Sequence, residues 1–210
     1  MANAIRPPWS AIFTKAFGIV AQEYPELRRV YLKYPWPHLY EYPASIAAVA
    51  IERRCGDENT VLGCMIMDPA NMPLREISGK IIHAASSPIE QVGEFRRALR
   101  NAALPLPIRR SLWWIMFNFG RQRSRYVGTF AVSAVASLGT ELIHPRSAWT
   151  AFLTYGAFAT DGSIDVRLIF DHRVLDGGTV ARILAHLEEV LNGPMVEALR
   201  SLAPSEVCRL

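Results

Sequence analysis

The stretch that decides the fold is Leu168-Ile169-Phe170-Asp171-His172-Arg173-Val174-Leu175-Asp176-Gly177-Gly178, near the C-terminal end of the chain. The residues from Val166 to Phe170 are mostly apolar and follow turn residues at 161–163, a pattern typical of a β-strand. After Gly178 the apolar residues recur with helical spacing. The sequence therefore predicts that a strand leads directly into a helix, with His172 held at the junction.

A histidine fixed at the end of a strand suits general acid/base chemistry, because an unperturbed imidazole titrates near neutral pH. A lone histidine at a strand end is also common as a surface or structural residue. Spacing alone therefore leaves both interpretations of His172 open.

The run from Asp171 to Gly177 resembles the Asp-His-Arg-x-x-Asp-Gly signature of the dihydrolipoamide acyltransferase catalytic domains of 2-oxoacid dehydrogenase complexes. It is similar, more distantly, to the His-x-x-x-Asp-Gly motif of chloramphenicol acetyltransferases, although Asp171-His172-Arg173 departs from their His-His pair. The stretch from Ser10 to Leu27 also resembles the first helix of the dihydrolipoamide acyltransferases, which carries a Lys-Ala pair and closes on Pro-Glu-Leu.

This resemblance extends from about Trp9 to Met195 and implies an α/β fold. The implied architecture is a two-layer sandwich with a mixed β-sheet covered by helices, of the chloramphenicol acetyltransferase-like type. Residue patterns of this chain agree with it: they predict helices over 9–24, 73–82 and 88–99 and strands over 46–52, 61–67, 149–158 and 164–170, with Ser10 as a cap of the first helix. A length of 210 residues suits a single catalytic domain, 1–210.

In the resembled family the active site lies between the subunits of a trimer, with a histidine from one subunit and a serine from the next. The resemblance implies that His172 is the general base and that Ser133 donates a hydrogen bond to the oxyanion. Asp176, in the same signature, is expected to hold the loop or cap the following helix. Arg173 is expected to bind the substrate and to orient the site through an ion pair with Asp171.

The choice of serine rests on register. The run from Gly128 to Ser133 resembles the Gly-Thr-Phe-Thr-Ile-Ser run of the family, and Ser137-Leu138-Gly139 resembles its Ser-Leu-Gly. The two runs are contiguous in the family but are separated here by Ala134-Val135-Ala136. We prefer Ser133 as the oxyanion donor and keep Ser137 as a substrate-binding candidate. Both serines could instead be turn residues, and His144, where the family usually has Asn, is expected to be structural.

The net charge, the cysteines and the apolar runs limit which partners and which compartment the protein can have. The formal net charge of +4 is compatible with an anionic substrate such as a coenzyme A ester, and we expect no nucleic-acid partner. The three cysteines, Cys55, Cys64 and Cys208, have no metal-ligand spacing and leave one thiol unpaired, so we expect no metal and a reducing, cytoplasmic setting. Cys55 and Cys64 are expected on paired strands as core thiols. No apolar run is long enough to span a bilayer.

The segment from Ile108 to Arg125 departs most from the family. It carries five arginines, no acidic residue and the adjacent Trp113 and Trp114. One interpretation is a helix lying on an anionic membrane surface. The alternative, which we prefer, is a helix packed against the body or a neighbouring subunit, with its arginines solvated.

The function that the resemblance implies is acyl transfer from a thioester, acyl-coenzyme A above all, to a thiol, hydroxyl or amine of a small-molecule or carrier-bound acceptor. The chain shows neither lipoyl nor subunit-binding segments, so we expect a free-standing catalytic domain that forms a homotrimer. The competing hypothesis is a non-catalytic trimeric scaffold that kept the fold while its serine site degenerated.

Overall fold

The computed structural model describes residues 6–134 and 147–202. Its α-helices are α1 (Trp9–Glu23), α2 (Leu74–Ser86), α3 (Gly93–Ala102), α4 (Leu106–Asn118), α5 (Gly120–Tyr126), α6 (Gly177–Asn192) and α7 (Pro194–Leu202), and short 3-10 helices span Pro25–Arg28 and Ile89–Gln91. The strands are β1 (Arg29–Leu32), β2 (His38–Glu41), β3 (Ile46–Cys55), β4 (Glu58–Met67), β5 (Phe130–Ala134), β6 (Ala151–Phe158) and β7 (Ile164–Phe170).

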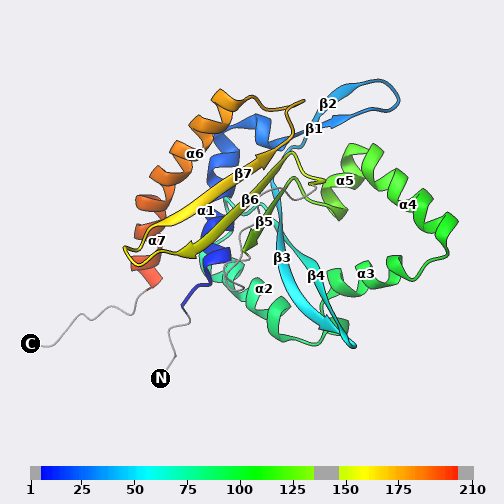
Figure 1. The fold of residues 1–210 in the computed structure, drawn as a ribbon, viewed down its shortest axis with the longest axis horizontal. Coiled ribbons are helices and arrows are strands. Elements are labelled where there is room, and N and C mark those ends of the chain that lie inside the picture. Colours follow the sequence, from blue (N-terminus) through cyan, green and yellow to red (C-terminus); the bar gives the residue numbers. More distant parts are fainter. Residues whose placement is uncertain (1–5, 135–146, 203–210) are drawn as a thin grey trace, which may run out of the picture.

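Five of these strands form one mixed sheet in the order β4-β3-β5-β6-β7 (Figure 1). The outer pairs, β3 with β4 and β6 with β7, are antiparallel, whereas β5 runs parallel to both of its neighbours. Strands β1 and β2 form a separate hairpin that projects from one end of the molecule. The predicted α/β architecture with a mixed sheet is therefore confirmed.

Helices α1, α2 and α6 cover one face of this sheet and bury the main hydrophobic core (Figure 1). Within it Phe17 of α1 meets Phe130 of β5 edge to face, with ring centroids 4.9 Å apart. Successive strand residues point to opposite faces. Val132 therefore joins Phe130 in this core, whereas Ala131 belongs to a second, smaller cluster on the opposite side.

We call that opposite side the outer face and define it by Ala48, Ala131, Phe152 and Ser133. The first three form the small hydrophobic cluster. Ser133 lies two residues beyond Ala131 in β5 and so points to the same side. Its side chain is 8% exposed, although it is polar. The outer face thus carries the candidate catalytic serine.

Two local predictions need correction. Ser10 lies inside α1, and the N-cap is Pro8, whose extended backbone allows the helix to begin after it. The basic segment forms two helices instead of one, because the backbone of Phe119 is extended and separates α4 from α5. At Gly120, the first residue of α5, a Cβ atom would come within 2.5 Å of the Tyr40 ring, so only glycine fits there.

The two described cysteines lie on paired strands, as predicted. Cys55 ends β3 and Cys64 lies in β4, and both are free thiols. Burial raises the pKa of the Cys64 thiol to about 11, which keeps it protonated and unreactive at neutral pH. Cys208 lies outside the described residues.

Candidate active site

The connection from β7 to α6 is a tight turn that exposes His172. The sheet continues one residue past β7, because the Asp171 amide donates to the carbonyl oxygen of Thr150 at 2.9 Å. The amides of Val174 and Leu175 then donate to the Asp171 carbonyl oxygen at 2.9 and 3.0 Å, which closes the turn. Leu175 is buried beneath it. The backbone on both sides of His172 is therefore fixed while its side chain faces solvent.

The imidazole of His172 lies against the ring of Phe170, with centroids 4.6 Å apart and planes tilted by 55°. Phe170 is the last residue of β7 and packs against the main core. One side of the imidazole is thus held by an apolar ring that the sheet anchors. This contact orients a side chain that would otherwise rotate freely at the surface.

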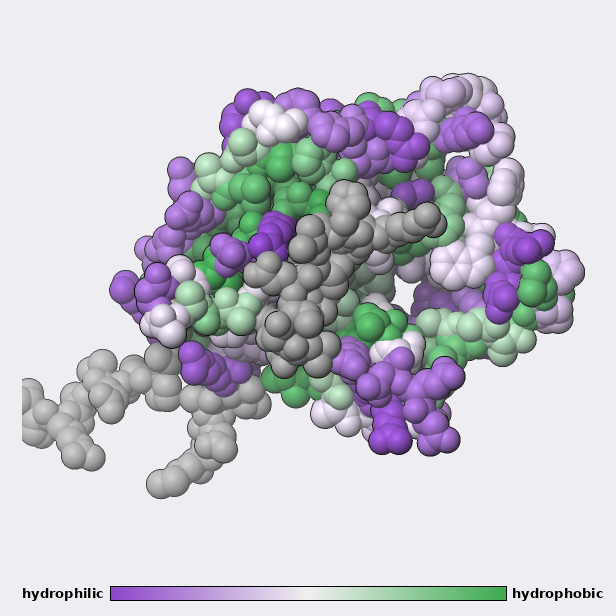
Figure 2. Space-filling view, viewed as in Figure 1, coloured by the Kyte–Doolittle hydropathy of each residue, from purple (hydrophilic) through white to green (hydrophobic). Residues whose placement is uncertain are grey.

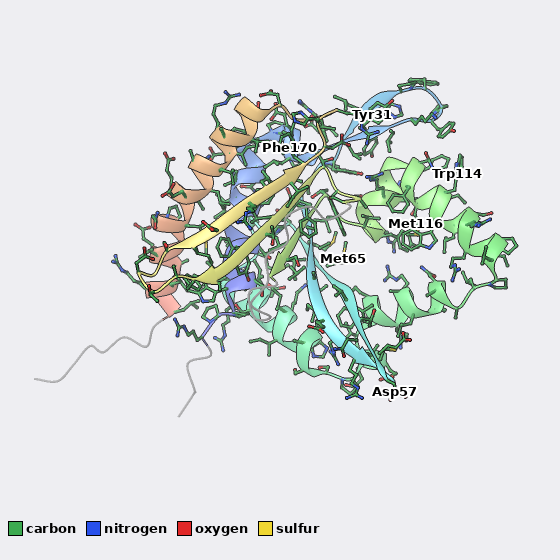
Figure 3. The ribbon with its side chains drawn as sticks, in the orientation of Figure 1. Tyr31, Asp57, Met65, Trp114, Met116 and Phe170 are labelled. Atoms are coloured by element: carbon green, nitrogen blue, oxygen red, sulfur yellow. The ribbon has the colours of Figure 1, made fainter. Side chains whose placement is uncertain are left out.

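The neighbours of His172 form an ion pair, as the sequence predicted. The Arg173 guanidinium donates to the Asp171 carboxylate from Nε at 2.9 Å and from Nη2 at 2.7 Å. The same guanidinium lies over the Tyr31 ring, 4.4 Å from its centroid. Hydrogen bonds from Arg173 hold the pKa of Asp171 below its usual value. The turn is therefore tied to β1 of the projecting hairpin, near which Figure 3 labels Tyr31 and Phe170.

This ion pair predicts how stability depends on pH. Because the folded-state pKa of Asp171 is lowered, its stabilisation is complete above the unfolded carboxyl pKa of about 4 and is lost as pH falls through the folded value. We expect Asp171→Asn to lower the melting temperature by a few degrees at neutral pH. Near pH 2 the two proteins should melt together. Thermal melts across this range measure the difference, and a constant gap would contradict the ion-pair explanation.

Asp176 is the N-cap of α6. Its carboxylate accepts hydrogen bonds from the Thr179 amide at 2.8 Å and from the Thr179 hydroxyl at 2.9 Å. These bonds lower the pKa of Asp176, so the carboxylate stays charged at the positive end of the helix. The capping role that its position predicted is thus observed.

Loss of this cap should destabilise the protein modestly. We expect Asp176→Ala to lower the melting temperature by a few degrees, because two hydrogen bonds at the start of α6 disappear. Asp176→Asn is the matched control, since an asparagine side chain also caps helices well. Thermal denaturation followed by circular dichroism measures both. Equal destabilisation by the two substitutions would contradict the capping explanation.

Ser133 and His172 do not meet within one chain. Ser133 pairs with Thr154, which pairs with Arg167, whereas Phe130 is level with Ala151 and Phe170. Phe130, Ala151 and Phe170 are thus level across the three strands. Ser133 lies three residues from this level in one direction along the strands, and His172 lies two residues from it in the opposite direction. Five residues at about 3.3 Å each place them about 16 Å apart along the strand direction alone. A site that uses both must take them from two copies.

Arg123 of α5 is a half-buried residue close to this turn that sequence reasoning missed. Its guanidinium donates to the carbonyl oxygens of Phe117 and Ala148 and lies near Asp171 and Tyr42. Burial lowers its pKa, although these neighbours favour its charged form. In the sequence it was one of five arginines expected to be solvated, and nothing in its spacing distinguishes it.

Tyr42 faces the same buried region. Its side chain is 2% exposed, and its hydroxyl oxygen has no hydrogen-bond partner in the described part of the chain. Burial raises the pKa of this hydroxyl, so it stays protonated. Arg123 therefore lies close both to Tyr42 and to Asp171, the first residue of the turn that carries His172.

Helix α4 matches neither of the two interpretations of the basic segment completely, that of a helix on a membrane surface and that of a helix packed against the body with solvated arginines. Met116 is its one buried residue, and Trp113, Trp114 and Ile115 are all more than two-fifths exposed. Trp114 contacts Tyr34 of the hairpin, with ring centroids 5.8 Å apart. The helix is thus attached at its inner side and presents apolar and basic residues outward.

Some predicted features fall outside what can be placed. Ser137 and His144 lie in the segment 135–146, beyond the described residues. Within 6–134 and 147–202, no three His, Cys, Asp or Glu side chains gather closely enough to hold a metal ion. Among the described helices, none is long and apolar enough to cross a membrane.

Comparison with known proteins bears on the fold. No protein-family model and no curated protein matches the sequence. Solved structures do: the dihydrolipoamide acetyltransferase of Azotobacter vinelandii is 16% identical, with a TM-score of 0.56 over 90% of this chain and 70% of that one. The catalytic core of the Thermoplasma acidophilum 2-oxoacid dehydrogenase complex is 18% identical, with a TM-score of 0.58 over 92% and 78%.

A chloramphenicol acetyltransferase matches as well, at 13% identity and a TM-score of 0.53 over 88% of this chain and 78% of that one. The chain has the fold of these acyltransferases. The resemblance first seen in the Asp171 to Gly177 signature is therefore confirmed at the level of the fold. Within this acyltransferase fold, the turn with His172 and the outer face with Ser133 are the two places where the sequence signatures fall.

Proposed function

We propose that the protein is an acyltransferase that moves an acyl group from a thioester, above all acyl-coenzyme A, to a thiol, hydroxyl or amine acceptor. The observation that carries this proposal is the position of His172. It is exposed and oriented by Phe170 at the strand-to-helix turn of an acyltransferase fold, where the Asp171 to Gly177 signature stands.

In the proposed reaction His172 removes the proton from the acceptor as the acceptor attacks the thioester carbonyl. Ser133 donates a hydrogen bond to the oxyanion of the tetrahedral intermediate. The thiolate of coenzyme A then leaves and takes the proton back from the imidazolium. The Asp171–Arg173 ion pair and the Asp176 cap keep the turn rigid while this happens.

The solved relatives support this assignment of residues. A serine, a histidine and an asparagine four positions after that histidine are named for their role in the catalytic mechanism of the Azotobacter vinelandii acetyltransferase. Here Asp176 stands four positions after His172. In this chain Asp176 caps α6, and asparagine would cap a helix equally well at that position.

The assembly that this mechanism needs is a homotrimer, as the resemblance implies. One chain keeps Ser133 and His172 about 16 Å apart along the strand direction, so a neighbouring copy must supply the partner residue. Membrane contact through Ile108 to Arg125 and residence in the cytoplasm stay predictions.

Turnover of thioesters tests the proposal. The purified protein is incubated with acetyl- and longer-chain acyl-coenzyme A and a panel of thiol, hydroxyl and amine acceptors, and release of free coenzyme A thiol is followed. We expect acceptor-dependent release. Size-exclusion chromatography with light scattering should show a trimer. A strict monomer, or no turnover with any donor, would contradict the proposal and favour the scaffold hypothesis.

A further inference from the structure

A cavity of about 550 Å³ lies between the sheet and the helices α3, α4 and α5. Met65 of β4 and Met116 of α4 line it from opposite sides, and both are labelled in Figure 3. We call α3, α4 and α5 the helical arm. In Figure 2 an opening in the surface lies between this arm and the rest of the molecule. The volume of the cavity falls within the range of sites that hold small organic molecules.

The floor of the cavity is made hollow by small residues. Ala48 of β3 and Gly63 of β4 both line it. A Cβ atom added at Gly63 would meet no atom within 4 Å, so the missing side chain leaves open space rather than relieving a clash. Glycine inside a strand weakens that strand and often marks a place where a ligand approaches closely. The glycine at position 63 is therefore consistent with a ligand lying against this part of β4.

The walls are aromatic and held in place. Trp113 and Phe117 of α4 are stacked, with centroids 5.4 Å apart and planes 15° from parallel. Trp149 donates its indole N–H to the carbonyl oxygen of Val127 at 2.7 Å, which fixes the ring. Tyr126 lies beneath the guanidinium of Arg97. These rings offer flat apolar surfaces suited to stacking.

The charged side chains of the cavity are mostly cationic. Arg97, Arg109 and Arg125 line it, and Glu94 is the one acidic residue among the described lining residues. Arg109 donates to the carbonyl oxygen of Ala102 at 3.0 Å, which leaves further guanidinium donors for a ligand. Arginine binds carboxylates and phosphates in a forked geometry. An apolar cavity with this charge balance selects an anion.

We propose that this cavity binds an organic anion with a flat aromatic body, such as an aryl carboxylate. The body stacks between the rings of α4 and Trp149 above Gly63, and the carboxylate lies against the arginines. The cavity shares the outer face with Ser133, through Ala48 beside Ala131. The binding itself does not depend on the proposed acyl transfer.

Calorimetry with naphthoate tests this binding on the intact protein, and tryptophan fluorescence gives a second readout because two tryptophans line the cavity. We expect one saturable site per chain. Naphthamide, which has the same body without the charge, should bind at least tenfold more weakly. Equal affinity for naphthamide would contradict the role of the arginines, and equal affinity for decanoate would contradict the aromatic selectivity.

Gly63→Val fills the floor with a residue that favours strands. We expect naphthoate affinity to fall at least tenfold, while the melting temperature stays equal or rises. Binding that survives unchanged would place the ligand elsewhere and overturn the proposal. Val61→Ala is the control, because Val61 is an exposed residue of the same strand β4 and does not line the cavity. We expect it to leave the naphthoate affinity unchanged.

A second pair of variants tests the charge without filling space. Arg97→Gln with Arg125→Gln removes two lining arginines, and we expect naphthoate to bind at least tenfold more weakly. Arg96→Gln with Arg121→Gln removes two exposed arginines from the same helices and changes the net charge equally. Equal weakening in both double variants would indicate a general charge effect and would overturn the proposed contact.

Discussion

His172→Ala should lower the rate of acyl transfer by about a hundredfold to ten-thousandfold, the range typical of removing a general base. In the proposed mechanism the acceptor loses a proton to His172 as it attacks, and the turn after β7 leaves this side chain exposed. Its backbone neighbours are held by the Asp171 turn and its ring by Phe170, so alanine removes the imidazole without disturbing the core.

Steady-state release of coenzyme A thiol measures the effect, with His83→Ala as the control. His83 is also an exposed histidine, but it lies on α2 and hydrogen bonds to Ser87. We expect this control to keep the rate of the unmodified protein. Turnover that is the same in His172→Ala would remove the general base from the proposed mechanism.

Ser133→Ala should lower the rate about a hundredfold or more, because one donor to the oxyanion is lost. The hydroxyl lies on the outer face within β5, and alanine removes one oxygen atom and adds no volume, so the strand accommodates it. Thr154→Ser is a suitable control: it changes a buried hydroxyl residue level with Ser133 but keeps a hydroxyl there.

Mixing the two inactive variants gives a sharper test. If His172 of one copy faces Ser133 of the next, trimers reassembled from equal amounts of His172→Ala and Ser133→Ala contain intact sites. With random exchange in a cyclic trimer, about a quarter of the sites regain both residues. Recovered activity near that fraction is expected after denaturation and refolding together. Absence of recovery, with mixed trimers shown by mass spectrometry, would contradict a site shared between copies.

Much of the fold follows from residue patterns. Short apolar runs within Ile46 to Met67 and Ala151 to Phe170, bounded by turn residues, predicted strands there that the structure contains, because central strands covered on both faces are apolar along much of their length. The turn with His172 was predicted because the period changes from strand to helix within a few residues. The Asp176 cap was predicted for the same reason, since its position precedes the helical pattern.

Other parts depend on contacts between distant segments, and single-sequence patterns do not record them. Gly120 is needed at the start of α5 because the Tyr40 ring occupies the space of a Cβ atom. Arg123 is half-buried beside Tyr42 and Asp171, which are distant in the sequence. Gly63 forms part of a cavity only because α3, α4 and α5 fold over the outer face. The structural role of each of these residues depends on a contact with a residue far away in the sequence.

The β1–β2 hairpin joins two regions that have no strand in common. Tyr31 of β1 lies under Arg173, the residue after His172, and three residues further on Tyr34 contacts Trp114 of α4. One short stretch of the hairpin therefore contacts both the turn that carries His172 and the helix α4, two segments that are far apart in the sequence.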